Sequence, residues 1–283
     1  MSTGLQTEPK LSQLIVREDT HDRIVAAIGD TMPAEQFISH ALVAFQAPEV
    51  RKCTPRSQLV AFMELAALGL LPTLNQAKLI PYKDEIKVMP QWQGFKALME
   101  RNKAVLEVQA FLVHVLDQFT YTARDGTLHV MDPFNPERQF RGPKDIRGGY
   151  LRITYRDGRP PRYHFVPVAQ IEKCRGCAQT QNVWTKWYEQ MALKTIYRDG
   201  YARRAVPMDP LVAGRMEKLL EADDALLGND PARIETTPLV DRIRRQREAA
   251  QNPAGPQTTD GHGAVENDAD TEAANGPSGT TPP

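Results

Sequence analysis

Cationic and aromatic side chains lie close together between Leu74 and Asn102, in the segment LNQAKLIPYKDEIKVMPQWQGFKALMERN. Proteins that hold a single nucleic-acid strand combine positive charge for the phosphates with flat side chains on which the bases stack. Trp92 and Phe95 stand among basic residues here, so this one segment offers both kinds of group. The cations of the segment that we predict to contact a nucleic-acid strand are Lys83, Lys87, Lys96 and Arg101.

A second mixture of rings and cations lies in NVWTKWYEQMALKTIYRDGYARR, residues 182–204. Trp184, Trp187 and Tyr188 have the spacing of a buried helix face, so core packing and base stacking both remain open for them. The cations predicted to contact the strand here are Lys194, Arg198, Arg203 and Arg204. A loop rich in Gly and Pro, residues 135–149, and the strand after it add Arg141, Lys144, Arg147 and Arg152.

The charge distribution supports a polyanionic partner. The whole chain has a formal net charge of zero, yet residues 51–205 hold 25 Lys and Arg against 14 Asp and Glu. Residues 1–50 and 206–283 carry the compensating acidic excess. A basic segment of this kind is typical of proteins that bind nucleic acids.

The residues carry few signs of an enzyme. The stretch KDEIK, residues 83–87, is similar to the acid-x-Lys end of some metal-dependent nuclease sites. Such a site needs a further acid to hold the ion, and Asp117 and Asp132 are the acids that could be proposed. A charged hairpin tip explains the stretch as well, so a nuclease using Glu85 and Lys87 is kept as an alternative. Because no GxxxxGK[ST] motif occurs, we expect no nucleotide cofactor. No Ser/His/Asp or Cys/His set has a recognisable local context, so we expect no enzyme activity.

The three cysteines do not predict a metal site. Cys174 and Cys177 form a CxxC pair, but a structural zinc needs four ligands, and no second pair has the required spacing. We therefore expect ordinary thiols, no bound metal and a reducing compartment. No run of about 18 apolar residues predicts a membrane span, and no secretion signal is visible. These features predict a cytoplasmic protein.

The elements that must position the cations are predicted to be helices, then strands, then helices. Thr54 and Pro55 favour a helix start and Gly69 favours its end. The predicted helices cover residues 21–46 in two pieces, 53–70, 94–103, 168–178, 182–204 and 209–227. The predicted strands cover 77–82, 86–91 and 104–116, with further hairpins around Asp125-Gly126 and Asp157-Gly158. This order predicts an α+β fold with a mainly antiparallel, curved sheet of hairpins flanked by helices.

Composition divides the chain into three parts. Every Trp, Tyr and Phe lies at or before Tyr201. We predict a flexible N-terminus over residues 1–20, one ordered domain over 21–227, and a disordered C-terminal tail over 228–283. Within the tail, residues 238–251 could form a short helix that binds a partner protein. The basic residues predicted to make that contact are Arg242, Arg244, Arg245 and Arg247. A charge run that only keeps the tail soluble explains these arginines as well.

Four ordered motifs resemble the RecT family of phage single-strand annealing proteins. The first is the turn GLLP at 69–72, and the second is Gln93-Gly94-Phe95-Lys96 preceded by Trp92. The third comprises Asp117, Phe119, Gly126, His129 and Pro133. The fourth comprises Trp184, Glu189, Met191, Lys194, Thr195 and Arg198. The resemblance covers about residues 20–208, and it implies that the domain 21–227 serves DNA binding, annealing and oligomerisation.

The resemblance implies a recombinase that needs no ATP. Such a protein would coat single-stranded DNA made by a partner exonuclease, pair it with a complementary strand, and hold the new duplex in an oligomeric ring or helical filament. It would support homologous recombination and repair in the cytoplasm of a bacterial host. Expected partners are single-stranded DNA, the annealed duplex, other copies of the chain, the exonuclease and the host single-strand binding protein. No cofactor is expected, although Mg²⁺ could modulate DNA binding.

A sequence-specific DNA-binding regulator remains a further alternative, although no helix-turn-helix or zinc-finger motif supports it.

Overall fold

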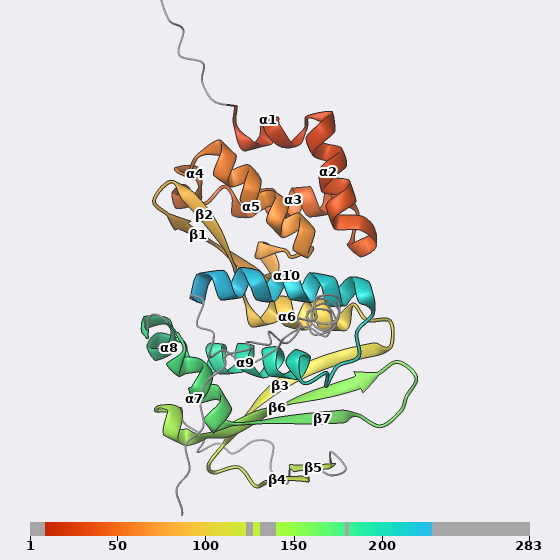
Figure 1. Ribbon diagram of the computed structural model, residues 1–283, viewed down its shortest axis with the longest axis vertical. Coiled ribbons are helices and arrows are strands. Elements are labelled where there is room, and N and C mark those ends of the chain that lie inside the picture. The colour runs from red at the N-terminus through yellow and green to blue at the C-terminus, as the bar shows by residue number, and fades with distance from the viewer. Residues whose placement is uncertain (1–8, 123–126, 131–139, 179–180, 228–283) are drawn as a thin grey trace, which may run out of the picture. The chain divides into compact units, whose positions relative to one another are not determined.

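The computed structural model describes residues 9–122, 127–130, 140–178 and 181–227 (Figure 1). The chain divides into two units, Met1–Glu235 and Thr236–Pro283, and all of the described residues belong to the first. The predicted tail, with its helix at 238–251 and its four arginines, lies outside the described residues.

The N-terminal part is helical and packs around α5. Its elements are α1 (Leu11–Ile15), α2 (Glu18–Ile28), η1 (Gly29–Thr31), α3 (Ala34–Ala44), α4 (Pro48–Arg51), α5 (Pro55–Leu68) and η2 (Pro72–Leu74). Helices α1, α2 and α3 all contact α5. The structure differs here from the expected flexible segment 1–20. Leu11 and Ile15 are buried in the core, so the ordered fold begins about ten residues earlier than predicted.

The predicted ends of α5 are confirmed. The Ser57 N–H donates to the Thr54 side-chain oxygen over 3.2 Å, which satisfies one of the unpaired donors of the first turn. Gly69 follows the last turn with φ of 64°, in the left-handed region that glycine adopts without strain. Phe62 and Ala66 of this helix are fully buried.

A hairpin follows the helical part. It consists of β1 (Ala77–Tyr82) and β2 (Glu85–Pro90), paired antiparallel from Ala77 opposite Pro90 to Tyr82 opposite Glu85. The two strands form a sheet of their own, and β2 packs on α5 and α10. Because proline cannot donate a ladder hydrogen bond, Pro81 and Pro90 disfavour the addition of a further strand.

The second half of the described chain places helices on a three-stranded antiparallel sheet. After α6 (Trp92–Glu100) come β3 (Val105–His114), β4 (Phe119–Thr122), β5 (Thr127–Val130), η3 (Pro143–Asp145), β6 (Ile146–Tyr155) and β7 (Arg162–Pro167). The sheet has the order β3-β6-β7, and β4 and β5 pair separately. The α+β class is confirmed, with three antiparallel sheets where we expected one main sheet.

The last helices connect the sheet to the helical part. They are α7 (Val168–Gly176), α8 (Asn182–Lys186), α9 (Tyr188–Ala202) and α10 (Pro210–Leu227). Helix α9 packs on β3, β6 and α6, and α10 packs on α5, α6 and β2 (Figure 1). The single helix predicted over 182–204 is broken at Trp187, whose φ of −132° and ψ of 42° are not helical.

Gly94 lies where α6 meets the chain just before β1. A Cβ atom at this position would stand 2.4 Å from the backbone oxygen of Gln76. We expect Gly94→Ala to lower the free energy of unfolding by about 1–3 kcal/mol, because backbone must shift to admit the methyl group. Urea unfolding followed by far-UV circular dichroism measures the change.

The matched control is Gly214→Ala. Gly214 also lies in a helix, but a Cβ atom there meets nothing within 4 Å. Alanine at this position is expected to raise the stability by about 0.5–1 kcal/mol, because it restricts the unfolded chain more than glycine does. Equal stabilities of the Gly94→Ala and wild-type proteins would contradict the close approach.

Candidate nucleic-acid interface

The tip of the β1–β2 hairpin presents two of the predicted cations to solvent. Lys83 occupies the turn with φ of 59°, and Lys87 lies on the exposed side of β2. The Lys87 ammonium is 3.2 Å from a carboxylate oxygen of Glu85, and both side chains are more than half exposed. An exposed ion pair of this kind contributes little to stability, so Lys87 can exchange the Glu85 carboxylate for a phosphate. Tyr82, beside the turn, is 67% exposed.

Three more predicted cations are exposed where the chain enters β6. Arg141 and Lys144 lie around η3, and Arg147 is the second residue of β6. The backbone N–H of Arg141 donates to the Asp145 carboxylate over 2.6 Å, and the Gly142 N–H donates to the same oxygen over 3.2 Å. These bonds close the turn, so the exposed cations extend from an ordered segment.

The C-terminal end of α9 exposes Arg203 and Arg204. The Arg204 backbone is left-handed, with φ of 54°, directly after the helix ends. The Arg203 side chain is 64% exposed, and its Nε is 3.9 Å from a carboxylate oxygen of Asp199. The other Asp199 oxygen is 2.8 Å from His164 Nε2 of β7, which ties this end of α9 to the sheet.

Lys194 and Arg198 differ from the expectation, because they face the interior. The Lys194 ammonium and the Arg198 guanidinium both donate to Asp223 of α10, which has no exposed surface. Arg198 also donates to Asp224 over 2.8 Å. Burial lowers the pKa of Lys194 despite the neighbouring carboxylate. Burial also disfavours the Arg198 cation, but Asp223 and Asp224 outweigh that cost and raise its pKa. These two cations join α9 to α10 and are not available to a phosphate in this arrangement.

Arg101 is also an internal cation. Its guanidinium donates to the carbonyl oxygens of Leu68 and Gly69, at the C-terminal end of α5. Arg215 of α10 donates in the same way to Ala27 and Ile28, at the end of α2. Burial and the nearby Arg215 lower the pKa of Arg101 to about 10. Carbonyl groups at helix C-termini carry partial negative charge, which compensates the two buried cations.

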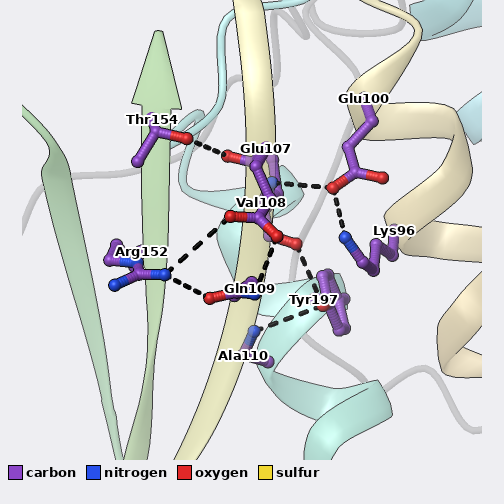
Figure 2. A network of polar contacts seen from close by, with 9 residues as sticks. All are labelled: Lys96, Glu100, Glu107, Val108, Gln109, Ala110, Arg152, Thr154 and Tyr197. Carbon is purple, nitrogen blue, oxygen red and sulfur yellow. Dashed lines mark hydrogen bonds and ion pairs between the residues drawn. The ribbon is translucent and has the colours of Figure 1, made fainter.

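Lys96 and Arg152 are partly exposed and lie on either side of β3 (Figure 2). Lys96 donates to Glu100, whose carboxylate also accepts the Val108 N–H over 3.0 Å. Arg152 of β6 donates to Gln109 of β3. The Lys96 side chain is 27% exposed and that of Arg152 is 38% exposed. Both cations hold neighbouring elements together while keeping part of their surface in solvent.

The aromatic residues divide in the same way. Phe95 is fully buried, so a base cannot stack on its ring. Trp92 is half-buried and stacks on Tyr197 with ring centroids 5.9 Å apart, while its indole N–H donates to Gln190 over 2.6 Å. Within the described residues, only two aromatic side chains reach the exposed class, Tyr82 and Trp187.

The structure shows two surface features that were not predicted from the sequence. The first is an aromatic row across the sheet, in which Phe111, Tyr150 and Phe165 lie in register on β3, β6 and β7. Phe119 of β4 stacks on this row, with its ring 5.8 Å from Tyr150 and 5.2 Å from Phe165. All four rings are half-buried. Alternation of Tyr163 and Phe165 in RYHF was the signal in the sequence that could have revealed it.

The second undetected feature is a set of exposed arginines at the turn between β6 and β7. Arg159 lies over the ring of Tyr155, with its guanidinium 3.5 Å from the ring centroid. Arg156 and Arg162 are exposed on either side of the same turn. Their clustering around the Asp157-Gly158 turn was the signal in the sequence, because a tight turn brings both flanking segments together.

The nuclease alternative gains no support from the described residues. Within them, no group of three or more His, Cys, Asp or Glu side chains is placed to hold a metal ion. Asp117 accepts the His114 backbone N–H over 2.7 Å, and Asp132 lies outside the described residues. Neither Cys174 nor Cys177 forms a disulfide. Among the described helices, none combines the length and apolar character needed to cross a membrane.

Comparison with models of known protein families gives a match. The model of the family described as RecT matches residues 35–236, which is more than half of the chain. The matched range contains every described cation and ring of the interface discussed above. A search of curated proteins finds no match.

Proposed function

Because this chain belongs to the RecT family, we propose that it is an ATP-independent single-strand annealing protein that acts in DNA recombination. It binds single-stranded DNA along its exposed cations and promotes pairing with a complementary strand. Multiple copies hold the strands together in a ring or helical filament. No nucleotide is consumed, and Mg²⁺ acts at most as a modulator of DNA binding.

One structural observation carries the proposal. Within the described residues, the internal cations Lys194, Arg198 and Arg101 are matched by buried acids or by helix carbonyls, whereas seven of the predicted cations are exposed. The exposed members of the predicted set are Lys83, Lys87, Arg141, Lys144, Arg147, Arg203 and Arg204. Annealing requires that two phosphate backbones approach each other while the base edges stay accessible. Cations that neutralise phosphates without covering the bases meet that requirement.

The direct test mixes two complementary dye-labelled oligonucleotides with the protein in the absence of nucleotide. Pairing much faster than the spontaneous reaction, for any sequence tested, is the expected result. Gel analysis of the same DNA after incubation with Mg²⁺ detects cleavage. No acceleration of pairing would refute the proposal. Strand cleavage that Glu85→Ala abolishes would favour the nuclease, and binding to one sequence only would favour a regulator.

The surface cations are expected to act additively. Lys83→Ala, Lys87→Ala, Arg203→Ala and Arg204→Ala should each weaken binding about equally for all DNA sequences. Each should also reduce the slope of log affinity against log salt by about 0.7, the value for one phosphate contact on a single strand. Fluorescence anisotropy at several salt concentrations measures both quantities.

The control for these variants is Arg17→Ala. Arg17 is exposed at the start of α2, next to Glu18 and Asp19. Its replacement by alanine should leave both the DNA affinity and the salt slope unchanged. If all four surface variants behave like this control, the interface lies elsewhere. The arginines around the β6–β7 turn are then the next candidates.

We further propose that the basic cluster at 241–247 binds partner proteins, namely an exonuclease and the host single-strand binding protein. A short basic helix suits an acidic peptide, which can become ordered on binding. Truncation after Gly228 is expected to preserve annealing of naked oligonucleotides and to impair annealing of strands coated by the binding protein. Equal activity of the truncated and full-length proteins on coated strands would contradict a docking role.

A further inference from the structure

Trp187 is exposed although the rings on either side of it are buried. Its side chain has 53% of its surface in solvent, whereas Trp184 and Tyr188 have 3% and 4%. The difference arises from the break between α8 and α9. In an uninterrupted helix Trp187 and Tyr188 would differ by one 100° step, but the extended φ of −132° turns the Trp187 side chain away from the core.

The backbone at Trp187 is held on both sides, so the ring has a defined position. The Trp187 N–H donates to the Val183 carbonyl over 2.8 Å, and the Met191 N–H donates to the Trp187 carbonyl over 3.0 Å. Gln181, just before α8, exchanges two hydrogen bonds with Arg175 of α7, over 3.2 Å and 3.0 Å. A large apolar ring that is exposed on a fixed backbone costs hydration free energy, which favours an occupant for its surface.

A lysine beside this ring favours an anionic occupant. The Lys186 ammonium lies 5.6 Å from the centroid of the Trp187 ring. Lys173 and Arg175 stand at the end of α7, which precedes α8 in the chain. Of the acids on α7 and in the first turn of α9, Glu172 accepts the Tyr188 hydroxyl over 2.7 Å and also pairs with Arg175, while Glu189 is exposed.

We propose that Trp187 is a nucleobase-stacking residue of the single-strand interface. One unpaired base stacks on the exposed face of the indole, and Lys186 neutralises the phosphate beside that base. This inference rests on the proposed single-strand binding. Stacking suits an annealing protein because the ring contacts the flat face of any base and leaves the Watson–Crick edge free for the incoming strand. Bases within a duplex are already stacked on one another, so this contact favours the single strand.

The experiment uses the full-length protein with two strands of equal length, oligo(dT) and an abasic deoxyribose-phosphate polymer. The wild-type protein should bind oligo(dT) more tightly than the abasic strand. The Trp187→Ala variant should bind oligo(dT) about tenfold more weakly than the wild type and the abasic strand with unchanged affinity. A loss of this size lies within the range of about 1–3 kcal/mol for one base stacked on an aromatic side chain. Trp187→Phe should retain most of the affinity, because it keeps an aromatic face.

Intrinsic fluorescence gives a second readout. Of the three tryptophans, Trp184 is buried and Trp92 is half-buried and stacked on Tyr197. Oligo(dT) should therefore quench mainly the emission of Trp187, and Trp187→Phe should remove most of that quenching. The control variant is Leu211→Ala, which truncates a 66% exposed side chain on α10 and should change neither measurement.

Several results would overturn the inference. They are unchanged oligo(dT) affinity in Trp187→Ala, an equal loss of affinity for the abasic strand, and quenching that persists in Trp187→Phe. A changed oligomeric state with unchanged DNA affinity would assign the ring to a contact between copies of the chain. Failure of the wild-type protein to bind either strand would instead refute the proposed function itself, so the two failures are distinguishable.

Discussion

Asp223→Asn is expected to lower the free energy of unfolding by about 3–5 kcal/mol, the cost of removing one partner from a buried ion pair. Asp223 has no exposed surface and accepts from both Lys194 and Arg198. The asparagine amide fills the same space but carries no charge. Two cations between α9 and α10 would then lose their main counter-charge, and the contact between these helices would weaken.

Asp224→Asn provides the matched control. Asp224 is the neighbouring residue and is also an aspartate, but its side chain is 35% exposed. It pairs with Arg198, which also pairs with Asp223. We expect this variant to lose less than about 1 kcal/mol, as is usual for solvated ion pairs. Urea unfolding of both variants at one low protein concentration measures the difference. Equal losses would show that the buried cluster is not the main connection between the helices.

The same geometry changes what is expected of Lys194→Ala. As a surface cation it would weaken DNA binding and leave the fold unchanged. As a buried partner of Asp223 it leaves a carboxylate in the interior without its ammonium, so it should destabilise the fold. A loss of DNA binding in this variant is therefore informative only when its unfolding transition is measured as well.

A rise in NaCl from 50 to 200 mM is expected to weaken single-stranded DNA binding by about 300-fold. Log affinity falls against log salt with a slope of about 0.7 per neutralised phosphate on a single strand, and six contacts give a loss of this order. Six contacts are within reach of the exposed cations at the β1–β2 hairpin, at the start of β6 and at the end of α9. Anisotropy titrations at four or more salt concentrations measure the slope.

A shallow salt dependence would contradict this interface. An affinity that changes less than about threefold over that range corresponds to about one phosphate contact. Most of the exposed cations would then face solvent or another copy of the chain. The wild-type slope also sets the reference for the single-cation variants, because each lost contact should lower it by the same increment.

Local signals in the sequence determined much of the fold. Thr54, Pro55 and Gly69 mark the two ends of α5 through capping and backbone conformation, which depend on residues only a few positions apart. Apolar runs on either side of charged or turn residues similarly predicted the β1–β2 hairpin and the strands of the main sheet. The ordered motifs identified the family, since each contains several fixed residue types at fixed spacing.

The tertiary structure alone decided which cations and rings face solvent. Lys194 and Arg203 belong to the same predicted basic group, but Lys194 meets Asp223 of α10 and Arg203 does not. Likewise, Trp184 and Trp187 have equivalent helical spacing until a break in the backbone turns one of them outward. Burial depends on partners that are distant in the chain and on the backbone path between them, and residue spacing within one helix contains neither. For this reason the sequence determined the family and the basic character of the interface. The ion pairs between α9 and α10 and the break before α9 decided which of its residues are exposed.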